Sequence, residues 1–412
     1  MAGLLKPTLV LLAGGALAQA LPLLVGPLLT RLYSPEQFGH YTLFAAIATN
    51  VAVVACGRYE YALPLVKDEA EARDLMALCL RLLVAVALAS VPLAWWLDAS
   101  GRLPAAGWLP LAVLSAGAVQ WLTMWSTRAQ RFHALATARV TQYGGAAGLQ
   151  AVAGGLQASV RGASQGLIVG PILANLATLL CLRRPAPAGG WAGLLTVPRA
   201  AWSAVARRHR NFPLLNTPHA FVGALQDTVA VLLLAWWLGD AAAGFWGLAL
   251  RYLKAPATLV GSAVSQALYP KLGRSEMPES RQAVRQVMLV LGARALPLVI
   301  VLLLFGPGLF AWLFGERWRD AGELARALAP YIGVHFVASP LAVVTLAWNA
   351  QGWALRLALV GQVIFLGSLA LGLVLGGLRG AAWGVSAGML AYFGWYFWSL
   401  ATWKEAPHAR LA

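Results

Sequence analysis

The chain has 412 residues, of which 60% are hydrophobic and only 11% are charged, and its formal net charge is +16. Soluble proteins carry about 25% charged residues, so this composition excludes a soluble enzyme. Most of the Lys and Arg residues lie in short segments between apolar runs, which fits the positive-inside pattern of membrane proteins rather than nucleic-acid binding. We therefore expect a membrane protein with no nucleic-acid partner.

Apolar runs of about 20 residues recur along the chain, and each matches the length that a helix needs to cross the ~30 Å hydrocarbon core. The first run follows Met1–Lys6 without a small-residue cleavage site, so we expect a retained helix rather than a signal peptide. The sequence predicts an all-α polytopic membrane protein with twelve spans, at residues 9–32, 41–65, 75–97, 108–126, 134–157, 163–182, 212–238, 243–269, 286–314, 325–348, 356–376 and 381–403.

The distribution of Lys and Arg predicts the orientation of these spans. If the N-terminus is cytoplasmic, the inner loops hold most of the basic residues, including the run Arg207-Arg208-His209-Arg210. Both termini are then expected on the cytoplasmic side. The outer loops hold only Arg102, Arg161, Arg317, Arg319 and Arg379.

The longest polar connection lies at mid-chain and divides the chain into two lobes. It predicts an N-terminal six-helix lobe at 1–182, a basic cytoplasmic linker at 183–211 and a C-terminal six-helix lobe at 212–412. Part of the linker is expected to be a basic helix that lies on the anionic leaflet, and a plain solvated loop is the alternative.

The two halves of the sequence repeat a glycine motif. Arg161-Gly162-Ala163-x-x-Gly166-x-x-x-Gly170 recurs as Arg379-Gly380-Ala381-x-x-Gly384-x-x-x-Gly388, at an offset of 379 − 161 = 218 residues. Six spans return the chain to the same side, so the repeat is parallel, with an axis along the membrane normal. This arrangement predicts two six-helix bundles around a central cavity. The Gly-x-x-x-Gly pairs are expected to serve helix packing rather than binding.

Charged residues inside the predicted spans indicate a substrate. Each costs ~2.5–3.5 kcal/mol at a helix centre and therefore normally faces a cavity. Cations outnumber anions, and Arg can grip a phosphate with two parallel hydrogen bonds. We predict that Arg31, Arg58, Arg251 and Lys254 bind a phosphate or pyrophosphate. The alternative is snorkelling to the headgroups, which we favour for the span-end residues Arg31, Arg139 and Arg326.

Two acidic residues in the spans, Glu60 and Asp227, are candidates for a coupling-ion site that takes H⁺ or Na⁺. The alternative is that each neutralises a nearby cation, such as Arg58. The sequence has no ATP-binding Gly-x-x-x-x-Gly-Lys-Ser/Thr motif, no His-Glu-x-x-His and no Cys/His metal spacing. No catalytic residue, metal site, cofactor or enzymatic activity is therefore expected.

Several segments match a known family in their order along the chain. In the first half they are Leu29-Thr-Arg-Leu-Tyr-Ser-Pro-Glu-Gln-Phe-Gly39 and Gly57-Arg-Tyr-Glu-Tyr-Ala-Leu63. In the second half they include Asn211-Phe-Pro213, Gln266-Ala-Leu-Tyr-Pro270 and Phe314-Gly-Glu-Arg-Trp-x-x-Ala-Gly322. This ordered set resembles Wzx-type O-antigen and polysaccharide flippases, which belong to the polysaccharide-transporter branch of the multidrug/oligosaccharidyl-lipid/polysaccharide (MOP) exporter superfamily.

The resemblance implies a flippase of the bacterial inner membrane that moves an undecaprenyl-pyrophosphate-linked oligosaccharide to the periplasmic leaflet. It implies alternating access driven by an ion gradient or by the membrane potential, and a cationic cavity that includes Arg31, Arg58 and Arg251. The expected partners are the lipid-linked oligosaccharide and membrane lipid. A polysaccharide polymerase and the chain-length machinery are further candidate partners, and the expected state is a monomer.

Two alternative functions are open at this point. A multidrug exporter of the same superfamily would need an acidic cavity, which the excess of intramembrane Arg and Lys disfavours. A membrane polysaccharide polymerase or ligase would need a larger outer loop and a catalytic constellation, and the sequence shows neither.

Overall fold

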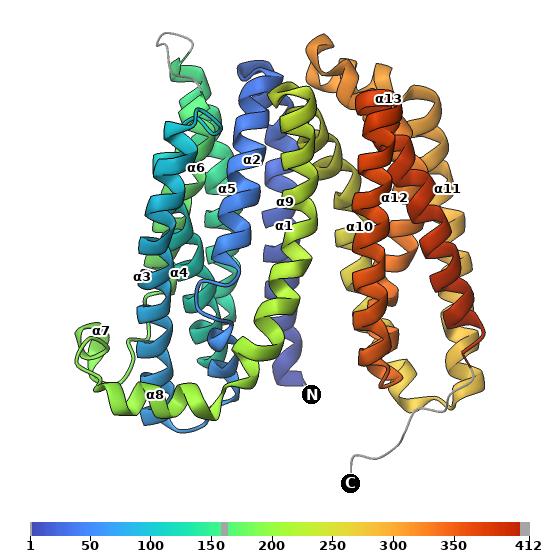
Figure 1. Cartoon of the computed structure of the whole chain (residues 1–412). Helices are drawn as coiled ribbons and strands as arrows, with labels where there is room; N and C mark the ends of the chain where they lie inside the picture. Colours follow the sequence, from blue (N-terminus) through green and yellow to red (C-terminus); the bar gives the residue numbers. More distant parts are fainter. Residues whose placement is uncertain (1, 158–163, 404–412) are drawn as a thin grey trace. The chain divides into compact units, whose positions relative to one another are not determined.

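The computed structural model describes residues 2–157 and 164–403, and over these residues it is helical with no strand (Figure 1). The last long helix, α13, is broken by non-helical backbone at Gly376 and Gly377, close to the loop predicted between the last two spans. The predicted all-α fold with two bundles is confirmed. The long helices are α1 (Ala2–Leu32), α2 (Pro35–Ala52), α3 (Glu69–Ala99), α4 (Leu109–Arg128), α5 (Phe132–Gln157), α6 (Ser164–Leu182), α9 (Thr217–Leu238), α10 (Asp240–Arg274), α11 (Met277–Phe314), α12 (Arg319–Ala347) and α13 (Gln351–Ala401).

By length and composition, 8 stretches of the described residues could cross a membrane, and they lie in α1, α3, α4, α6, α9, α11, α12 and α13. The helices α2, α5 and α10 fall outside this set. Of these, α10 carries Arg251 and Lys254, and α2 leads directly into the segment with Arg58 and Glu60. The less apolar helices therefore include those closest to the charged residues that the sequence analysis selected.

The chain forms two compact units, Met1–Leu232 and Leu233–Ala412. The division falls inside α9. The lobes predicted at 1–182 and 212–412 follow from the polar mid-chain segment at 183–211, and they stay a prediction.

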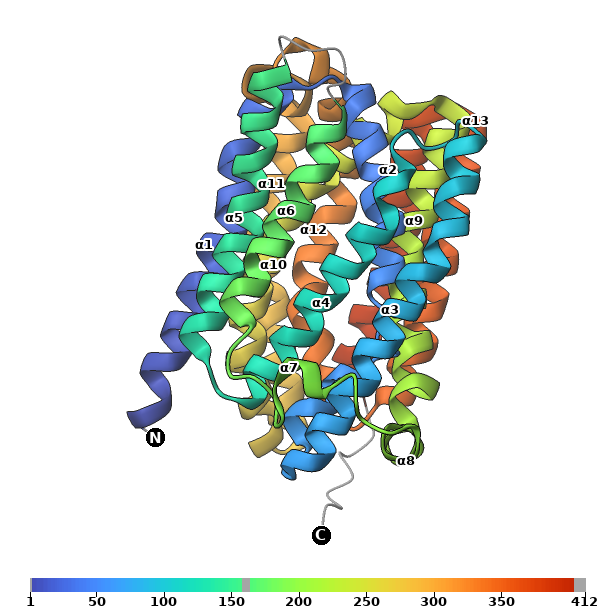
Figure 2. The same cartoon turned by 90° about the vertical axis from the view of Figure 1, so that its left-hand side faces the viewer.

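Small residues bring the helices of the first unit into close contact. Figure 2 shows α5 beside α1 and α6, and α4 beside α3. A Cβ atom added at Gly14 on α1 would lie 2.7 Å from Ala136 on α5, and one added at Gly144 would lie 2.6 Å from Leu21. The backbones of α1 and α5 therefore approach too closely for larger side chains, as is common between membrane helices.

The first family-like segment forms the connection between α1 and α2. Ser34 is the N-cap of α2, and its hydroxyl and the side chain of Gln37 form a reciprocal capping box. The hydroxyl of Tyr33 donates to the carbonyl of Gln150 at 2.8 Å, which fixes this connection to α5. This segment therefore has a structural role as a helix cap.

The basic mid-chain segment contains the short helices α7 (Gly190–Gly193) and α8 (Arg199–Arg208). Figure 1 shows α8 lying across the end of the first unit at which α3 begins. Its last turn is held by Glu71 of α3, which lies 3.0 Å from both Arg208 and His209. Arg199, Arg207 and Arg208 are exposed.

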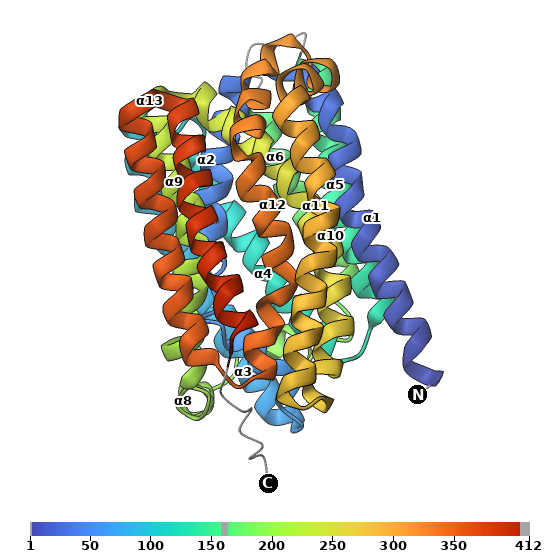
Figure 3. The ribbon, with the colours of Figure 1, turned by 90° about the vertical axis from the view of Figure 1, so that its right-hand side faces the viewer.

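In the second unit, α12 packs against α10, α11 and α13 (Figure 3). A Cβ atom at Gly322 of α12 would lie 2.6 Å from the carbonyl oxygen of Gly306 on α11, so these two backbones touch. Polar side chains add specific contacts, because Trp348 Nε1 donates to Ser280 Oγ at 2.8 Å. Gly322 belongs to a family-like segment, and its role there is packing.

The glycine repeat packs the two halves of α13 against each other. A Cβ atom at Gly384 would lie 2.4 Å from the carbonyl oxygen of Ser368, and one at Gly388 would meet the Ser368 side chain. In the first copy, a Cβ atom at Gly170 would lie 3.0 Å from Gln150. Residues 161–163 of that copy lie outside the described residues. The packing interpretation is confirmed for these three glycines.

Candidate functional site

The second predicted span, 41–65, is not one continuous helix, and this prediction was wrong. Helix α2 ends at Ala52, and a short 3₁₀-helix, η1 (Tyr59–Leu65), follows after a series of turns. Gly57 and Arg58 both have left-handed backbone, with φ of 58° and 60°. Non-helical backbone at membrane depth is tolerated only where it is buried in protein or lines a cavity. The break therefore marks a candidate functional site.

The turn before η1 is held by its own hydrogen bonds and by close packing. The amides of Ala55 and Gly57 donate to carbonyl groups three residues earlier, at 3.1 and 2.8 Å. Gly117 of α4 makes room for the turn, because a Cβ atom there would lie 3.3 Å from Ala55. A left-handed conformation costs a non-glycine residue such as Arg58 about 1–2 kcal/mol. Such strain persists where the surrounding structure enforces it, and it often marks functional positions.

The guanidinium group of Arg58 lies over the ring of Tyr61, with its central carbon 4.1 Å from the ring centroid. Its Nη1 donates to the Tyr61 hydroxyl at 3.2 Å, and no other hydrogen-bond acceptor contacts Arg58 among the described residues. A cation over an aromatic face gains about 0.5–2 kcal/mol. Arg58 is partly exposed, although its Nε is buried without a partner, so the guanidinium nitrogens other than Nε are the donors that a ligand can reach.

Other arginines in the spans or at their ends differ from Arg58, because they donate their hydrogen bonds to backbone carbonyl oxygens. Arg81 of α3 donates to Ala77, Leu194, Leu195 and Val197, at 2.9 to 3.1 Å. Arg128 donates to Val66 and Lys67 and pairs with Glu69. In the second unit, both bonds of Arg285 go to the carbonyl of Ala401. These arginines fasten loops and helix ends, so they are poor candidates for binding an anion.

Glu60 follows Arg58 in η1 and is only 2% exposed. Its Oε2 has no hydrogen-bond partner in the described part of the chain, and Glu60 and Arg58 form no ion pair there. A buried carboxylate oxygen without a partner is costly, and a bound proton or cation removes that cost. The arrangement is compatible with an ion site, and the predicted coupling role of Glu60 stays a prediction.

The remaining predicted site residues occupy three different helices. Arg31 is exposed in the last turn of α1, and Asp227 is exposed on α9. Arg251 and Lys254 lie one turn apart on α10 of the second unit, and both are partly buried. Arg58 and Glu60 share one short segment, as Arg251 and Lys254 share one helical turn. The substrate and ion roles of these residues stay predictions.

Tyr61 and Gln120 were not predicted as site residues from the sequence. Gln120 of α4 donates from Nε2 to the Tyr61 hydroxyl at 2.8 Å. It lies one turn after Gly117, the residue that lets the α2–η1 turn approach α4. A polar glutamine in the middle of an apolar span is the signal that could have identified it.

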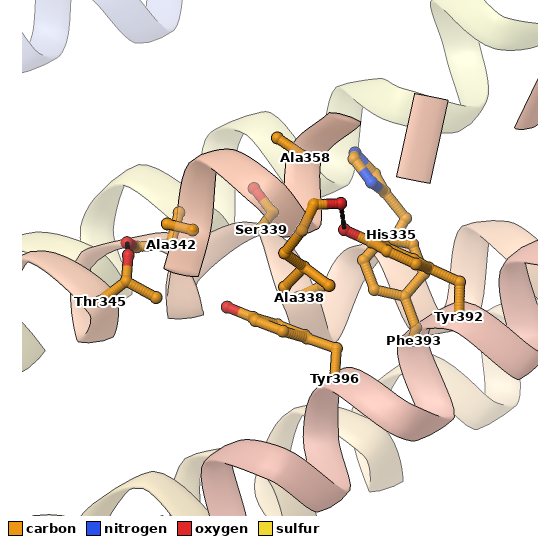
Figure 4. A pocket seen from close by; sticks show the side chains of 11 residues that line it. His335, Ala338, Ser339, Ala342, Thr345, Ala358, Tyr392, Phe393 and Tyr396 are labelled. Carbon is orange, nitrogen blue, oxygen red and sulfur yellow. Dashed lines mark hydrogen bonds between the residues drawn. The ribbon is translucent and has the colours of Figure 1, made fainter. Parts of the chain in front are cut away.

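The second unit contains a pocket of about 220 Å³ between α12 and the two halves of α13 (Figure 4). Its wall is formed by alanines, by the rings of Tyr392, Phe393 and Tyr396, and by His335. The Tyr392 hydroxyl donates to the carbonyl of Leu357 at 3.1 Å. No Lys, Arg, Asp or Glu is among the lining residues, so this pocket does not fit an anion.

The fold is similar to that of three solved membrane-transporter structures. A multidrug resistance MATE family transporter in an inward-facing conformation has a TM-score of 0.69 at 14% identity, over 94% of this chain and 96% of that chain. The lipid II flippase MurJ, in an inward closed conformation, has a TM-score of 0.74 at 11% identity, over 95% of this chain and 90% of that chain. The Vibrio cholerae MATE transporter VcmN, in its bent form, has a TM-score of 0.56 at 16% identity, over 97% of each chain.

Residues 28–323 match the model of the polysaccharide biosynthesis protein family, and the chain belongs to that family. The match covers more than half of the chain and includes the α2–η1 break. The resemblance to the polysaccharide-transporter branch of the MOP superfamily is confirmed. No curated protein matches this sequence. The apolar helices and the fold are those of a multi-pass membrane protein.

Proposed function

We propose that the protein is a flippase for an undecaprenyl-pyrophosphate-linked oligosaccharide, such as an O-antigen repeat unit or another surface polysaccharide unit. It moves this lipid from the cytoplasmic to the periplasmic leaflet of the bacterial inner membrane, with both of its own termini in the cytoplasm. The family match to polysaccharide biosynthesis supports the sugar-lipid substrate, and the transporter fold supports translocation.

The observation that carries the proposal is the guanidinium group of Arg58, which lies at the break between α2 and η1. Among the described residues it donates a hydrogen bond only to Tyr61. A pyrophosphate is the charged part of the proposed substrate, and its oxygens accept hydrogen bonds from arginine in the bidentate geometry that Arg favours. Arg31, Arg251 and Lys254 would add cations at other stages of translocation. The oligosaccharide would pass by alternating access, driven by an ion gradient or by the membrane potential.

Complementation tests this proposal directly. The gene is expressed in a strain that lacks its own O-antigen flippase, and surface polysaccharide is examined on a gel. Restored surface polymer is the expected result. If the protein is present in the membrane and polymer is absent across hosts with different repeat units, the flippase proposal fails.

A multidrug exporter is the second candidate, because one of the structural matches is a multidrug resistance transporter. Drug-resistance assays on the same overexpressing strain separate the two functions. Increased resistance to organic cations without restored polymer would favour the exporter. We expect restored polymer without increased resistance, because a cationic site repels cationic drugs.

Glu60 is the residue that we propose for coupling to protons. In Glu60→Gln the side chain keeps its size but cannot take up or release a proton. We expect reconstituted Glu60→Gln protein to flip the lipid-linked oligosaccharide at the same rate with and without an imposed pH gradient, whereas the wild type accelerates. Asp227→Asn, the exposed alternative, is the matched comparison. If Glu60→Gln responds to the gradient as the wild type does, Glu60 is not the coupling residue.

A further inference from the structure

The Tyr61 hydroxyl oxygen accepts hydrogen bonds from two donors, so its own proton can be donated only to another group. It accepts a hydrogen bond from Arg58 Nη1 at 3.2 Å and from Gln120 Nε2 at 2.8 Å. A phenol oxygen carries one proton and a limited number of lone pairs. Two incoming donors occupy the acceptor side, so the hydroxyl proton is available only to a third group. None of the described contacts of Tyr61 uses that proton.

The unused hydrogen-bond donors of Arg58 and Tyr61 therefore favour one class of ligand. Arg58 contributes N–H groups that no described residue accepts, and Tyr61 contributes its O–H. Arg58, Tyr61 and Gln120 are all partly exposed, so a ligand can reach the cluster. The donors and the positive charge that Arg58 and Tyr61 offer favour an anion with several acceptor oxygens. A phosphate or diphosphate meets this requirement.

The geometry also orders the parts of the cluster. Gly57 and Arg58 have left-handed backbone, and the guanidinium group of Arg58 lies over the ring of Tyr61, three residues later in the chain. Gln120 approaches from α4 and holds the hydroxyl from the other side. Tyr61 thereby fixes Arg58 through the ring face and through the hydroxyl, and Gln120 fixes Tyr61.

We propose that Arg58 and Tyr61 form a two-residue clamp for the diphosphate of the transported lipid, in which Arg58 supplies charge and Tyr61 donates a hydrogen bond. Gln120 is the positioning residue of this clamp. The proposal rests on the proposed flippase function and goes beyond it, because it adds Tyr61 as a residue that binds the diphosphate and Gln120 as the residue that positions Tyr61. Loss of the Tyr61 hydroxyl weakens diphosphate binding even though the ring and Arg58 remain.

The test measures binding of two probes, farnesyl diphosphate and inorganic pyrophosphate, to the purified full-length protein in detergent by calorimetry. Tyr61→Phe keeps the ring under the guanidinium and removes only the hydroxyl, and we expect binding about tenfold weaker. Gln120→Leu keeps the size of the side chain, and we expect a smaller loss. Tyr143→Phe, which changes an exposed tyrosine of α5, is the matched control and should bind as the wild type does. The thermal unfolding temperature (Tm) of each variant is measured as well, and equal values show that all of the variants are folded.

Chemical rescue separates a direct role of Tyr61 from a structural one. Free guanidinium ion is added to Arg58→Ala, where it can occupy the place over the Tyr61 ring, and we expect binding of the probes to recover in part. In the double variant Arg58→Ala/Tyr61→Phe, recovery should be absent or much smaller. Equal recovery in both variants would show that the hydroxyl is not part of the site.

The outcomes distinguish this inference from the proposed function. If Arg58→Ala loses binding and Tyr61→Phe and Gln120→Leu do not, the clamp is wrong and the flippase proposal stands. If the wild type binds neither probe, the clamp is also overturned, and complementation then decides the function independently. Binding of both probes supports a site that reads the diphosphate alone, whereas binding of farnesyl diphosphate only supports a clamp that also requires the lipid.

Discussion

Replacing Arg58 by alanine should abolish restoration of surface polysaccharide in a flippase-deficient strain while leaving the protein in the membrane. Arg58 keeps most of its donors free of protein partners, and a hydrogen bond to a charged group contributes about 1.5–3 kcal/mol. Loss of one such bond slows transport by about 10- to 100-fold, and loss of the charge adds to this effect. Arg58→Lys keeps the charge without the planar fork, so an intermediate rate is expected.

The control for Arg58→Ala is Arg139→Ala. Arg139 is an exposed arginine of α5 in the same unit, and its side chain is expected to reach the headgroups. It should restore surface polymer as the wild type does. Full restoration by Arg58→Ala, at the wild-type protein level, would remove Arg58 from the proposed binding site. The rate itself is measured with labelled lipid-linked oligosaccharide in proteoliposomes.

Replacing Gly384 by leucine should sharply reduce the amount of folded protein. A Cβ atom at this position would lie 2.4 Å from the backbone oxygen of Ser368, so the two halves of α13 must separate to admit any side chain. Overpacking costs about 1–3 kcal/mol even where neighbouring side chains can move, and a backbone contact cannot yield in that way. We expect a several-fold lower yield of monodisperse protein and a clearly lower Tm.

Gly394→Leu is the matched control in the same half of α13. Nothing lies within 4 Å of a Cβ atom at Gly394, so leucine should be accepted there with a yield close to that of the wild type. Both changes replace a helical glycine by the same residue, so their difference isolates the close contact. Equal yields of the two variants would contradict the packing role of the repeated glycine motif.

The long apolar helices could be predicted from the sequence because their length is fixed by the membrane. The predicted span 163–182, for example, ends at the same residue as α6. The break at Gly376 and Gly377 also falls next to the predicted loop. In contrast, the break after α2 was missed because apolar residues flank Gly57, Arg58 and Glu60 on both sides, and only the backbone conformation shows where the helix stops.

The candidate site was only partly predictable for the same reason. Arg58 and Glu60 were identified because charge inside an apolar run is costly. Tyr61 and Gln120 were not, because their importance comes from a shared hydrogen bond across a 59-residue separation. The roles of Arg81 and Arg128 also depended on contacts, since the carbonyl groups that they bind become visible only in the folded chain.

The attachment of α8 has a practical consequence for antibody fragments and other binders raised against this protein. The hydroxyl of Tyr59, the residue after Arg58, donates to the carbonyl of Ala206 in α8 at 3.1 Å. Arg199 and Arg207 of α8 are both exposed and form an easily recognised basic epitope. A fragment that displaces α8 would pull directly on the segment that holds Arg58. Binders intended to leave transport intact should therefore be selected against other epitopes, and those that recognise α8 should be screened as inhibitors.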